Sequence, residues 1–165
     1  MTNLDIRVSK LGIRFAGRFF PASIGRRGIS TSKKEGDSIT PAGTHKIIGI
    51  LYRPDRLVKP CSWAVKIKPF DIWSDDVNDP NYNMMGKLPQ KYSHERISRP
   101  DPLYDIVVLT DWNWPYPIKG NGSAIFIHIW RKSRHPTEGC VAMSRQDLLW
   151  IIKRLKPQSR LVITT

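Results

Sequence analysis

Short apolar runs separated by glycine and proline make up most of the chain, and many of them alternate between apolar and polar residues. Alternation with a period of two is typical of a half-buried strand. Segments 6–9 and 11–15 show this pattern and are expected to pair, and further strands are expected at 19–25, 45–52 and 63–68. The first half of the chain is therefore predicted to consist of short strands.

The second half contains longer apolar runs and one clear helical pattern. Segments 105–109 and 123–129 are nearly continuous apolar runs, typical of central strands covered on both faces. A last strand is expected at 160–164. Ser144 can cap a helix in which apolar residues recur at helical spacing before Pro157 ends it. We therefore predict a mainly β fold with few helices, one of them near the C-terminus.

The length and composition predict a single domain over residues 1–165. The chain is 40% hydrophobic and 25% charged, which is enough apolar surface for a core. No apolar run approaches the roughly 18 to 20 residues that cross a bilayer. Between residues 71 and 102 the composition shifts toward Asp, Asn, Pro, Tyr and Met. We interpret 71–102 as a long irregular insertion, and such loops often carry function.

The charge is strongly unbalanced, with 27 Lys and Arg residues against 14 Asp and Glu residues and a net charge of +13. A surface this basic attracts polyanions such as nucleic acid, anionic lipid or an acidic wall polymer. The sequence has no recognisable helix-turn-helix, zinc-finger or RNA-recognition signature. A nucleic-acid-binding module is therefore a distant alternative, and we expect no nucleic acid partner.

The most informative residues are a histidine near a strand end and a cysteine twelve residues later. His128 lies near the end of the predicted strand 123–129, and Cys140 follows Gly139 and precedes the predicted cap Ser144. A thiol becomes a good nucleophile beside an imidazole or a helix N-terminus. Gly139 lets the backbone approach a substrate and direct N–H groups toward an oxyanion. Cys140 is therefore the candidate nucleophile and His128 the candidate base.

Other interpretations of these residues stay open at this point. Cys61 has no chemical neighbours in sequence and is expected to be structural, although a disulfide between Cys61 and Cys140 is possible. A metal site formed by His128, His135, Glu138 and Cys140 is chemically possible, but its spacing matches no common zinc pattern. We expect neither a metal nor a cofactor.

Several short motifs resemble the L,D-transpeptidases, whose catalytic domain is also called YkuD. Residues 136–142 (Pro-Thr-Glu-Gly-Cys-Val-Ala), with the upstream histidine, resemble the family's catalytic stretch, and 40–43 (Thr-Pro-Ala-Gly) are similar to a second family motif. Residues 93–96, 104–105 and 122–126 resemble a compact proteobacterial subfamily. The resemblance spans nearly the whole chain. It implies a YkuD-like β-sandwich of mixed sheets, with one C-terminal helix after the cysteine.

The resemblance also implies a reaction. Cys140 would attack an L-D bond of a peptidoglycan stem peptide, form a thioester, and transfer it to the diaminopimelate side-chain amine of another stem. The crosslink would start from position 3 of the donor, or from position 1 given the altered pocket. Hydrolysis of the same thioester would instead make an L,D-carboxypeptidase or endopeptidase. His128 would be the base, and the amides of Gly139 and Cys140 the oxyanion donors; the group that orients His128 is not assigned.

The chain departs from the commoner family pattern on both sides of the cysteine. Glu138 stands two residues before it in place of a histidine, and Ala142 stands two residues after it in place of an arginine. An alanine cannot hold a carboxylate as a guanidinium does, so another basic residue is expected to bind the donor. The candidates are Arg96, Arg131 and Arg134.

A further hypothesis concerns the insertion. We expect His94 to fold over the reactive sulfur beside Tyr92 and Tyr104, the alternative being a surface loop histidine. The other expected substrate contacts are Ser123, Glu138 and the rim residue His135.

The inferred substrate and the N-terminal sequence give different indications of location. Peptidoglycan crosslinking takes place outside the cytoplasmic membrane, so we expect action in the periplasm or cell wall. Residues 1–10 show no export signal, and the cytoplasm is therefore the alternative. A basic surface is compatible with retention on an anionic wall. The sequence gives no indication of the oligomeric state.

Overall fold

A computed structural model describes residues 4–165, so that the first three residues of the segment searched for an export signal lie outside it. The elements in the first half of the chain are β1 (Ile6–Ser9), β2 (Gly12–Phe15), β3 (Arg18–Phe20), β4 (Ala22–Ser23), β5 (Ile29–Ser30), β6 (Thr40–Pro41), β7 (Gly43–Tyr52), β8 (Val65–Lys66) and β9 (Asp71–Ser74). They are followed by β10 (Met85–Lys87), β11 (His94–Arg96), β12 (Ile106–Thr110), β13 (Phe126–Ile129), β14 (Val141–Met143), α1 (Arg145–Ile152) and β15 (Arg160–Ile163).

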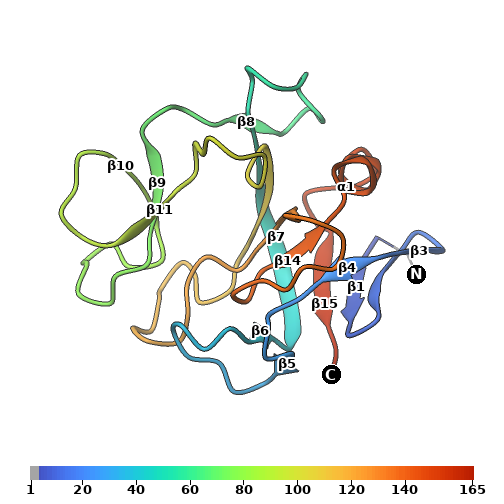
Figure 1. The fold of residues 1–165 in the computed structure, drawn as a ribbon, viewed down its shortest axis with the longest axis horizontal. Coiled ribbons are helices and arrows are strands. Elements are labelled where there is room, and N and C mark those ends of the chain that lie inside the picture. The colour runs from blue at the N-terminus through green and yellow to red at the C-terminus, as the bar shows by residue number, and fades with distance from the viewer. Residues whose placement is uncertain (1–3) are drawn as a thin grey trace.

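Ten strands form one sheet in the order β3-β2-β1-β15-β7-β12-β13-β14-β4, with β8 beside the end of β7. The long strand β7 belongs to both halves, because its first residues pair with β15 and its later residues pair with β12 (Figure 1). The pairs β1–β15, β13–β14 and β7–β8 are parallel, and the other pairs in this sheet are antiparallel. The predicted mixed-sheet β architecture is therefore confirmed.

The central strands bury both of their faces, as their continuous apolar runs predicted. On β12, Ile106 and Val108 pack into the larger core, which lies between the halves of the sheet and α1. The intervening Val107 and Leu109 pack into a second cluster that also contains Phe126 of β13. Alternate residues of a strand point to opposite faces, so one apolar run serves two cores. The second cluster supports the cavity described below.

The predicted helix is present but shorter than its apolar pattern indicated. The Ser144 hydroxyl accepts a hydrogen bond from the amide of Asp147, as a capping residue does. Leu148 and Ile151 are buried, and the helix ends at Ile152. Strand β14 lies between Cys140 and this helix, so the cysteine is not at the helix N-terminus.

The segment 71–102, expected to be irregular, contains a small antiparallel sheet in the order β10-β9-β11. This sheet lies to one side of the main sheet (Figure 1). Asn83 ties it to the rest of the molecule: its side chain accepts hydrogen bonds from the Trp73 indole and the Ala124 amide. The same side chain donates to the carbonyls of Trp112 and Asn113. The insertion is thus fixed to the loop before β13.

Two strand predictions differ in extent from the structure. The strand expected at 19–25 is divided into β3 and β4 at Pro21, which has no N–H to continue a ladder. Of the segment 63–68, only Val65–Lys66 forms a strand. Within residues 4–165, the single helix has eight residues and is too short to cross a membrane.

Candidate active site

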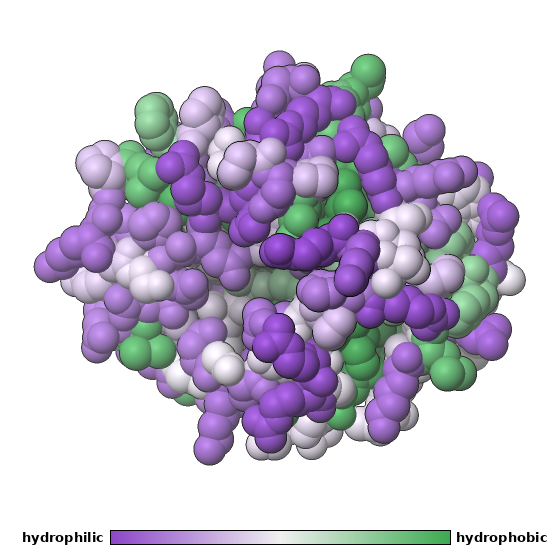
Figure 2. Space-filling view, viewed as in Figure 1, coloured by the Kyte–Doolittle hydropathy of each residue, from purple (hydrophilic) through white to green (hydrophobic). Residues whose placement is uncertain are grey.

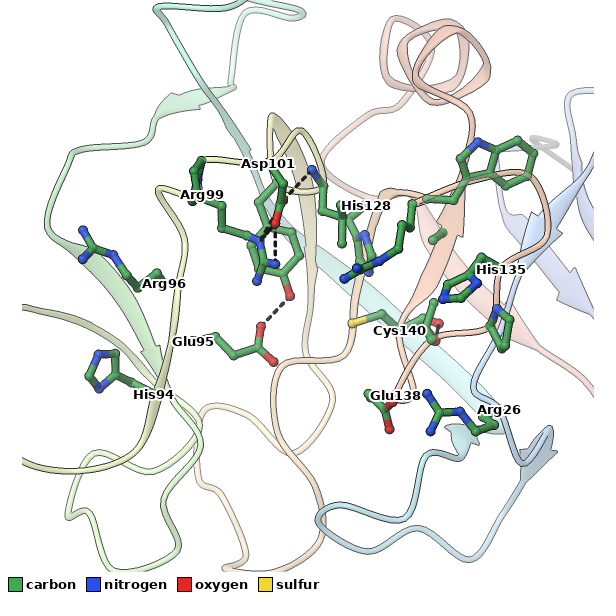
Figure 3. Close-up of a pocket in the computed structure, with 18 residues that line it drawn as sticks. Arg26, His94, Glu95, Arg96, Arg99, Asp101, His128, His135, Glu138 and Cys140 are labelled. Carbon is green, nitrogen blue, oxygen red and sulfur yellow. Dashed lines mark hydrogen bonds and ion pairs between the residues drawn. The ribbon is translucent and has the colours of Figure 1, made fainter.

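The parallel pairing of β13 and β14 brings the predicted base and nucleophile together. His128 pairs in register with Ala142, and Ile127 pairs with Val141, so Cys140 lies immediately before the paired residues of β14. Residues two apart on a strand share a face, which places Cys140 and Ala142 on the same face as His128. His128 and Cys140 both line a cavity of about 740 Å³ (Figure 3). We call β13 and β14, with these two residues, the floor of the cavity.

His128 is held in one orientation and one charge state. Its Nδ1 donates a hydrogen bond of 2.8 Å to the carbonyl of Ile129, and the Tyr104 ring packs edge-on at 5.2 Å between centroids. Burial lowers the pKa of His128 to about 4, so the imidazole is neutral at neutral pH. With the proton on Nδ1, Nε2 is the atom that can accept another. The Ile129 carbonyl is therefore the orienting group that the sequence did not assign.

Cys140 is a neutral thiol in the resting site. Its Sγ donates to the carbonyl of Ala124 at 3.0 Å and accepts from the amide of Phe126 at 3.4 Å. Burial, with a smaller contribution from the negative charge of Glu95, raises the pKa of the thiol to about 12. The thiol and the imidazole are thus both neutral at rest, so proton transfer has to accompany attack on a substrate.

The turn before Cys140 is fixed by two threonines. The Thr137 hydroxyl accepts from the Gly139 amide at 3.1 Å and donates to the Cys140 carbonyl at 2.5 Å. The Thr40 hydroxyl donates to the Gly139 carbonyl at 2.8 Å, so the motif at 40–43 supports this turn. The Gly139 amide is therefore engaged and is not free to bind an oxyanion in this conformation.

Glycine is needed at position 139 for steric reasons. Its φ is +142°, and a Cβ there would lie 2.9 Å from the carbonyl oxygen of Ile39. Lys33 lies on the same side, with its Nζ 3.6 Å from that Cβ position, and is paired with Asp37. The positive charge of Lys33 has a small lowering effect on the pKa of Cys140.

Residues 94–104, which we call the wall of the cavity, come from β11 and the segment that follows it. The Tyr104 hydroxyl donates to Oε2 of Glu95 at 2.5 Å. Arg99 pairs with Asp101 at 2.7 Å and lies over the Tyr104 ring at 5.1 Å from its centroid. The wall therefore presents charged groups opposite the largely apolar floor.

The other side of the cavity contains an arginine that the sequence did not indicate. Arg26 pairs with Glu138 at 2.5 Å, and the second carboxylate oxygen of Glu138 accepts from the Ser38 hydroxyl. Arg26 is brought here by the bridge between Gly25 and Thr137. Glu138 does line the cavity, as predicted, but its carboxylate is already paired.

The predicted substrate contacts are only partly brought together. His94, Arg96, Tyr104, Arg131, His135 and Glu138 line the cavity. Tyr92, Ser123 and Arg134 do not, and Arg134 instead donates to the Leu11 carbonyl. The lining residues that the sequence did not indicate include Arg26, Glu95, Arg99, Asp101, Leu103 and Trp130.

The position expected for His94 is wrong. Figure 3 shows the His94 and Arg96 side chains at the outer edge, away from Cys140, whereas Glu95 between them points inward. His94 Nδ1 donates to the Tyr92 carbonyl at 2.7 Å, which holds the ring at this edge. Successive side chains of a strand point to opposite sides, so only one of the three faces the sulfur.

The alternative roles considered for the cysteines find no geometric support. Cys61 and Cys140 are both free thiols, and Cys61 packs against the larger core. In the part of the chain that the structure describes, no three His, Cys, Asp or Glu side chains converge as metal ligands.

Comparison with known proteins identifies the family of the chain. The family model "L,D-transpeptidase catalytic domain" (YkuD) matches residues 16–163, and the chain therefore belongs to that family. A search of curated proteins gave no match. Among solved structures, an L,D-transpeptidase from Mycobacterium smegmatis is similar, with 13% identity and a TM-score of 0.42. The similarity covers 93% of this chain but only 52% of that one, so this chain spans about half the neighbour's length.

Proposed function

We propose that this chain is a cysteine-dependent peptidoglycan L,D-transpeptidase. One observation carries the proposal. The Cys140 thiol and the neutral, oriented His128 imidazole come from adjacent parallel segments and line the same cavity. Membership of the L,D-transpeptidase family supports the same reaction. The position of the substrate outside the cytoplasmic membrane makes the periplasm or cell wall the proposed site of action.

The first half-reaction forms a thioester. His128 Nε2 takes the Cys140 proton as the sulfur attacks the carbonyl carbon of an L-residue that precedes a D-residue in the stem peptide. The carbon–nitrogen bond breaks, and His128 returns the proton to the leaving amino group. Because His128 is neutral at rest, it accepts this proton without first losing another.

The second half-reaction transfers the acyl group to the diaminopimelate side-chain amine of another stem. The basic residues around the cavity suit the carboxylates of stem peptides and include Arg26, Arg96, Arg99 and Arg131. Together they replace the arginine that the family usually carries where this chain has Ala142. The donor is cut after position 3 or position 1, and the two give crosslinks of different mass.

Purified muropeptides of defined stem length test this proposal. We expect the protein to form dimers, seen by mass spectrometry, and a covalent adduct on Cys140 in the intact protein. Cys140→Ala should abolish both, whereas Cys61→Ala, which removes the other free thiol, should retain both. Shortened monomers without dimers would make the protein a hydrolase, and a wild-type protein without any adduct would refute the proposal.

A further inference from the structure

Within residues 4–165, three acidic side chains line the cavity, and one of these three lacks a cationic partner. Asp101 is paired with Arg99, and Glu138 is paired with Arg26. Glu95 accepts a hydrogen bond from the Tyr104 hydroxyl through Oε2, and within residues 4–165 it forms no ion pair. Its other oxygen, Oε1, has no hydrogen-bond partner within that range. In a cavity surrounded by arginines, Glu95 is the acid still able to bind a cation.

The negative charge of Glu95 also lies where it is unfavourable for the first half-reaction. Figure 3 shows the Cys140 sulfur pointing toward the side of the cavity where the Glu95 carboxylate lies. The negative charge raises the pKa of Cys140 and so opposes formation of the thiolate. It also raises the pKa of the adjacent Tyr104 hydroxyl. A carboxylate that hinders acylation is best explained by a role in the step that follows.

We propose that Glu95 is the binding site for the acceptor amine, holding its ammonium group beside the thioester on Cys140 and taking one of its protons. This inference rests on the proposed function, since it assigns a residue to the second half-reaction. The ligand class is a primary amine that is protonated in solution, as alkyl amines are at neutral pH. The surrounding arginines repel such a group, so a single carboxylate determines where it binds.

The proton balance of the step can be written in full. The ammonium gives one proton to the free carboxylate oxygen of Glu95, and the nitrogen lone pair then attacks the thioester carbonyl carbon. The carbon–sulfur bond breaks, and the second proton passes from the nitrogen through His128 to the Cys140 sulfur. The products are the amide, the free thiol and a protonated Glu95, which returns its proton to solvent. Burial raises the pKa of Glu95, which makes it a better proton acceptor than an exposed carboxylate.

Glu95→Gln tests the proposal with little structural disturbance, because the amide oxygen can still accept from Tyr104. The acyl-enzyme would be formed with a stem-peptide donor and then mixed with one of two amines at pH 7. One is a diaminopimelate-containing stem peptide, whose amine is protonated, and the other is hydroxylamine, which is mostly uncharged. We expect acylation at least as fast as in the wild type, transfer to the stem peptide slower by about 10- to 100-fold, and an unchanged reaction with hydroxylamine.

Glu35→Gln is a matched control. Glu35 accepts a hydrogen bond from the Tyr82 hydroxyl at 2.5 Å, the same contact as in the Tyr104–Glu95 pair, but neither residue lines the cavity. We expect this variant to treat both amines as the wild type does, so that loss of a tyrosine–glutamate contact alone is excluded as the cause.

The outcomes separate the two proposals. A Glu95→Gln variant that reacts with both amines at wild-type rates, or loses both equally, would overturn the amine site and leave the transpeptidase assignment in place. Failure of that variant to acylate while the wild type does would also overturn it, because Glu95 would then act before the acceptor. A wild-type protein that forms no thioester would refute the enzymatic assignment itself.

Discussion

The floor and the wall of the cavity are built in opposite ways. The floor consists of two adjacent strands of a ten-stranded sheet, and its reactive groups are neutral. His128 is buried, and Cys140 is half-buried against apolar neighbours. The wall consists of β11, which belongs to a separate three-stranded sheet, and the segment that follows it, and it presents charged side chains, including Glu95 and Arg99. The space-filling view shows a predominantly hydrophilic face with a hollow near its middle (Figure 2).

This difference indicates that the floor and the wall have separate functions, catalysis and substrate selection. A rigid sheet fixes the thiol and imidazole relative to each other, which acid–base catalysis requires. A charged wall outside the main sheet can select and orient the substrate's charged groups. We therefore expect substitutions in the floor to abolish bond-making in both half-reactions, and substitutions in the wall to change which amine is used.

The largest effect is expected for His128→Gln in the floor. Without a base to accept the thiol proton, formation of the acyl-enzyme should slow by about 10³-fold, because the thiol is otherwise almost fully protonated. The measurement is the rate at which the adduct appears by intact mass. Glu95→Gln, the wall variant, should acylate normally in the same assay. An acylation rate of His128→Gln within tenfold of the wild-type rate would contradict the assignment of acid–base catalysis to the floor.

The floor could be predicted from sequence because its signals are local. The apolar run around Phe126 indicates a strand buried on both faces, and a histidine near its end with a Gly-Cys pair nearby indicates a thiol site. Strand β14 gave no comparable signal, since Val141–Met143 is only three residues long. Its pairing with β13 is nevertheless what determines how Cys140 and His128 share a face.

The wall could be predicted only in part, because its sequence has no periodic pattern. Glu95 and Arg99 lie in a polar, proline-rich segment, where nothing in the sequence indicates that β11 pairs with β9. The missed pairing also explains the wrong choice of His94, since the strand's alternation decides which neighbour faces the sulfur. Arg26 was missed for a different reason: it lies 112 residues from Glu138 in sequence.

The next effect tests whether one residue fixes the insertion to the loop before β13. Asn83 is buried and has a φ of +57°, and its side chain makes four hydrogen bonds. Asn83→Ala leaves those partners unsatisfied and places alanine in a left-handed conformation. We expect a loss of about 4 kcal/mol in the free energy of unfolding, measured with urea. One of the lost bonds is to Ala124, whose carbonyl accepts from the Cys140 thiol.

Asn81→Ala provides the control, because Asn81 is an exposed asparagine two residues away in the same segment. Its free energy of unfolding should stay within about 0.5 kcal/mol of the wild type. Equal stabilities of the two variants would mean that Asn83 does not connect the insertion to the loop before β13.

The smallest effect concerns the stability of the folded protein in acid, which should depend on His128 of the floor and not on His94 of the wall. The pKa of His128 is lowered to about 4 in the folded protein, against about 6.5 for a histidine in an unfolded chain. The unfolded chain therefore binds a proton at a higher pH, and stability should fall as the pH falls from 6.5 to 4. The shift of about 2.5 units corresponds to about 3 kcal/mol, lost progressively across that interval.

The comparison of variants isolates this contribution from other titrating groups. His45 also has a pKa lowered by burial, and the ion-paired carboxyls of Asp37 and Asp101 have lowered pKa values, so protonating them in acid also destabilises the protein and the wild type alone does not identify the cause. Urea unfolding at pH 7 and pH 4 should show a smaller loss for His128→Gln than for the wild type, whereas His94→Gln at the outer edge should match the wild type. A full acid loss in His128→Gln would contradict the burial of a neutral base. The same burial that destabilises the protein in acid keeps Nε2 unprotonated at neutral pH, so acid sensitivity and readiness to accept the Cys140 proton have one physical cause.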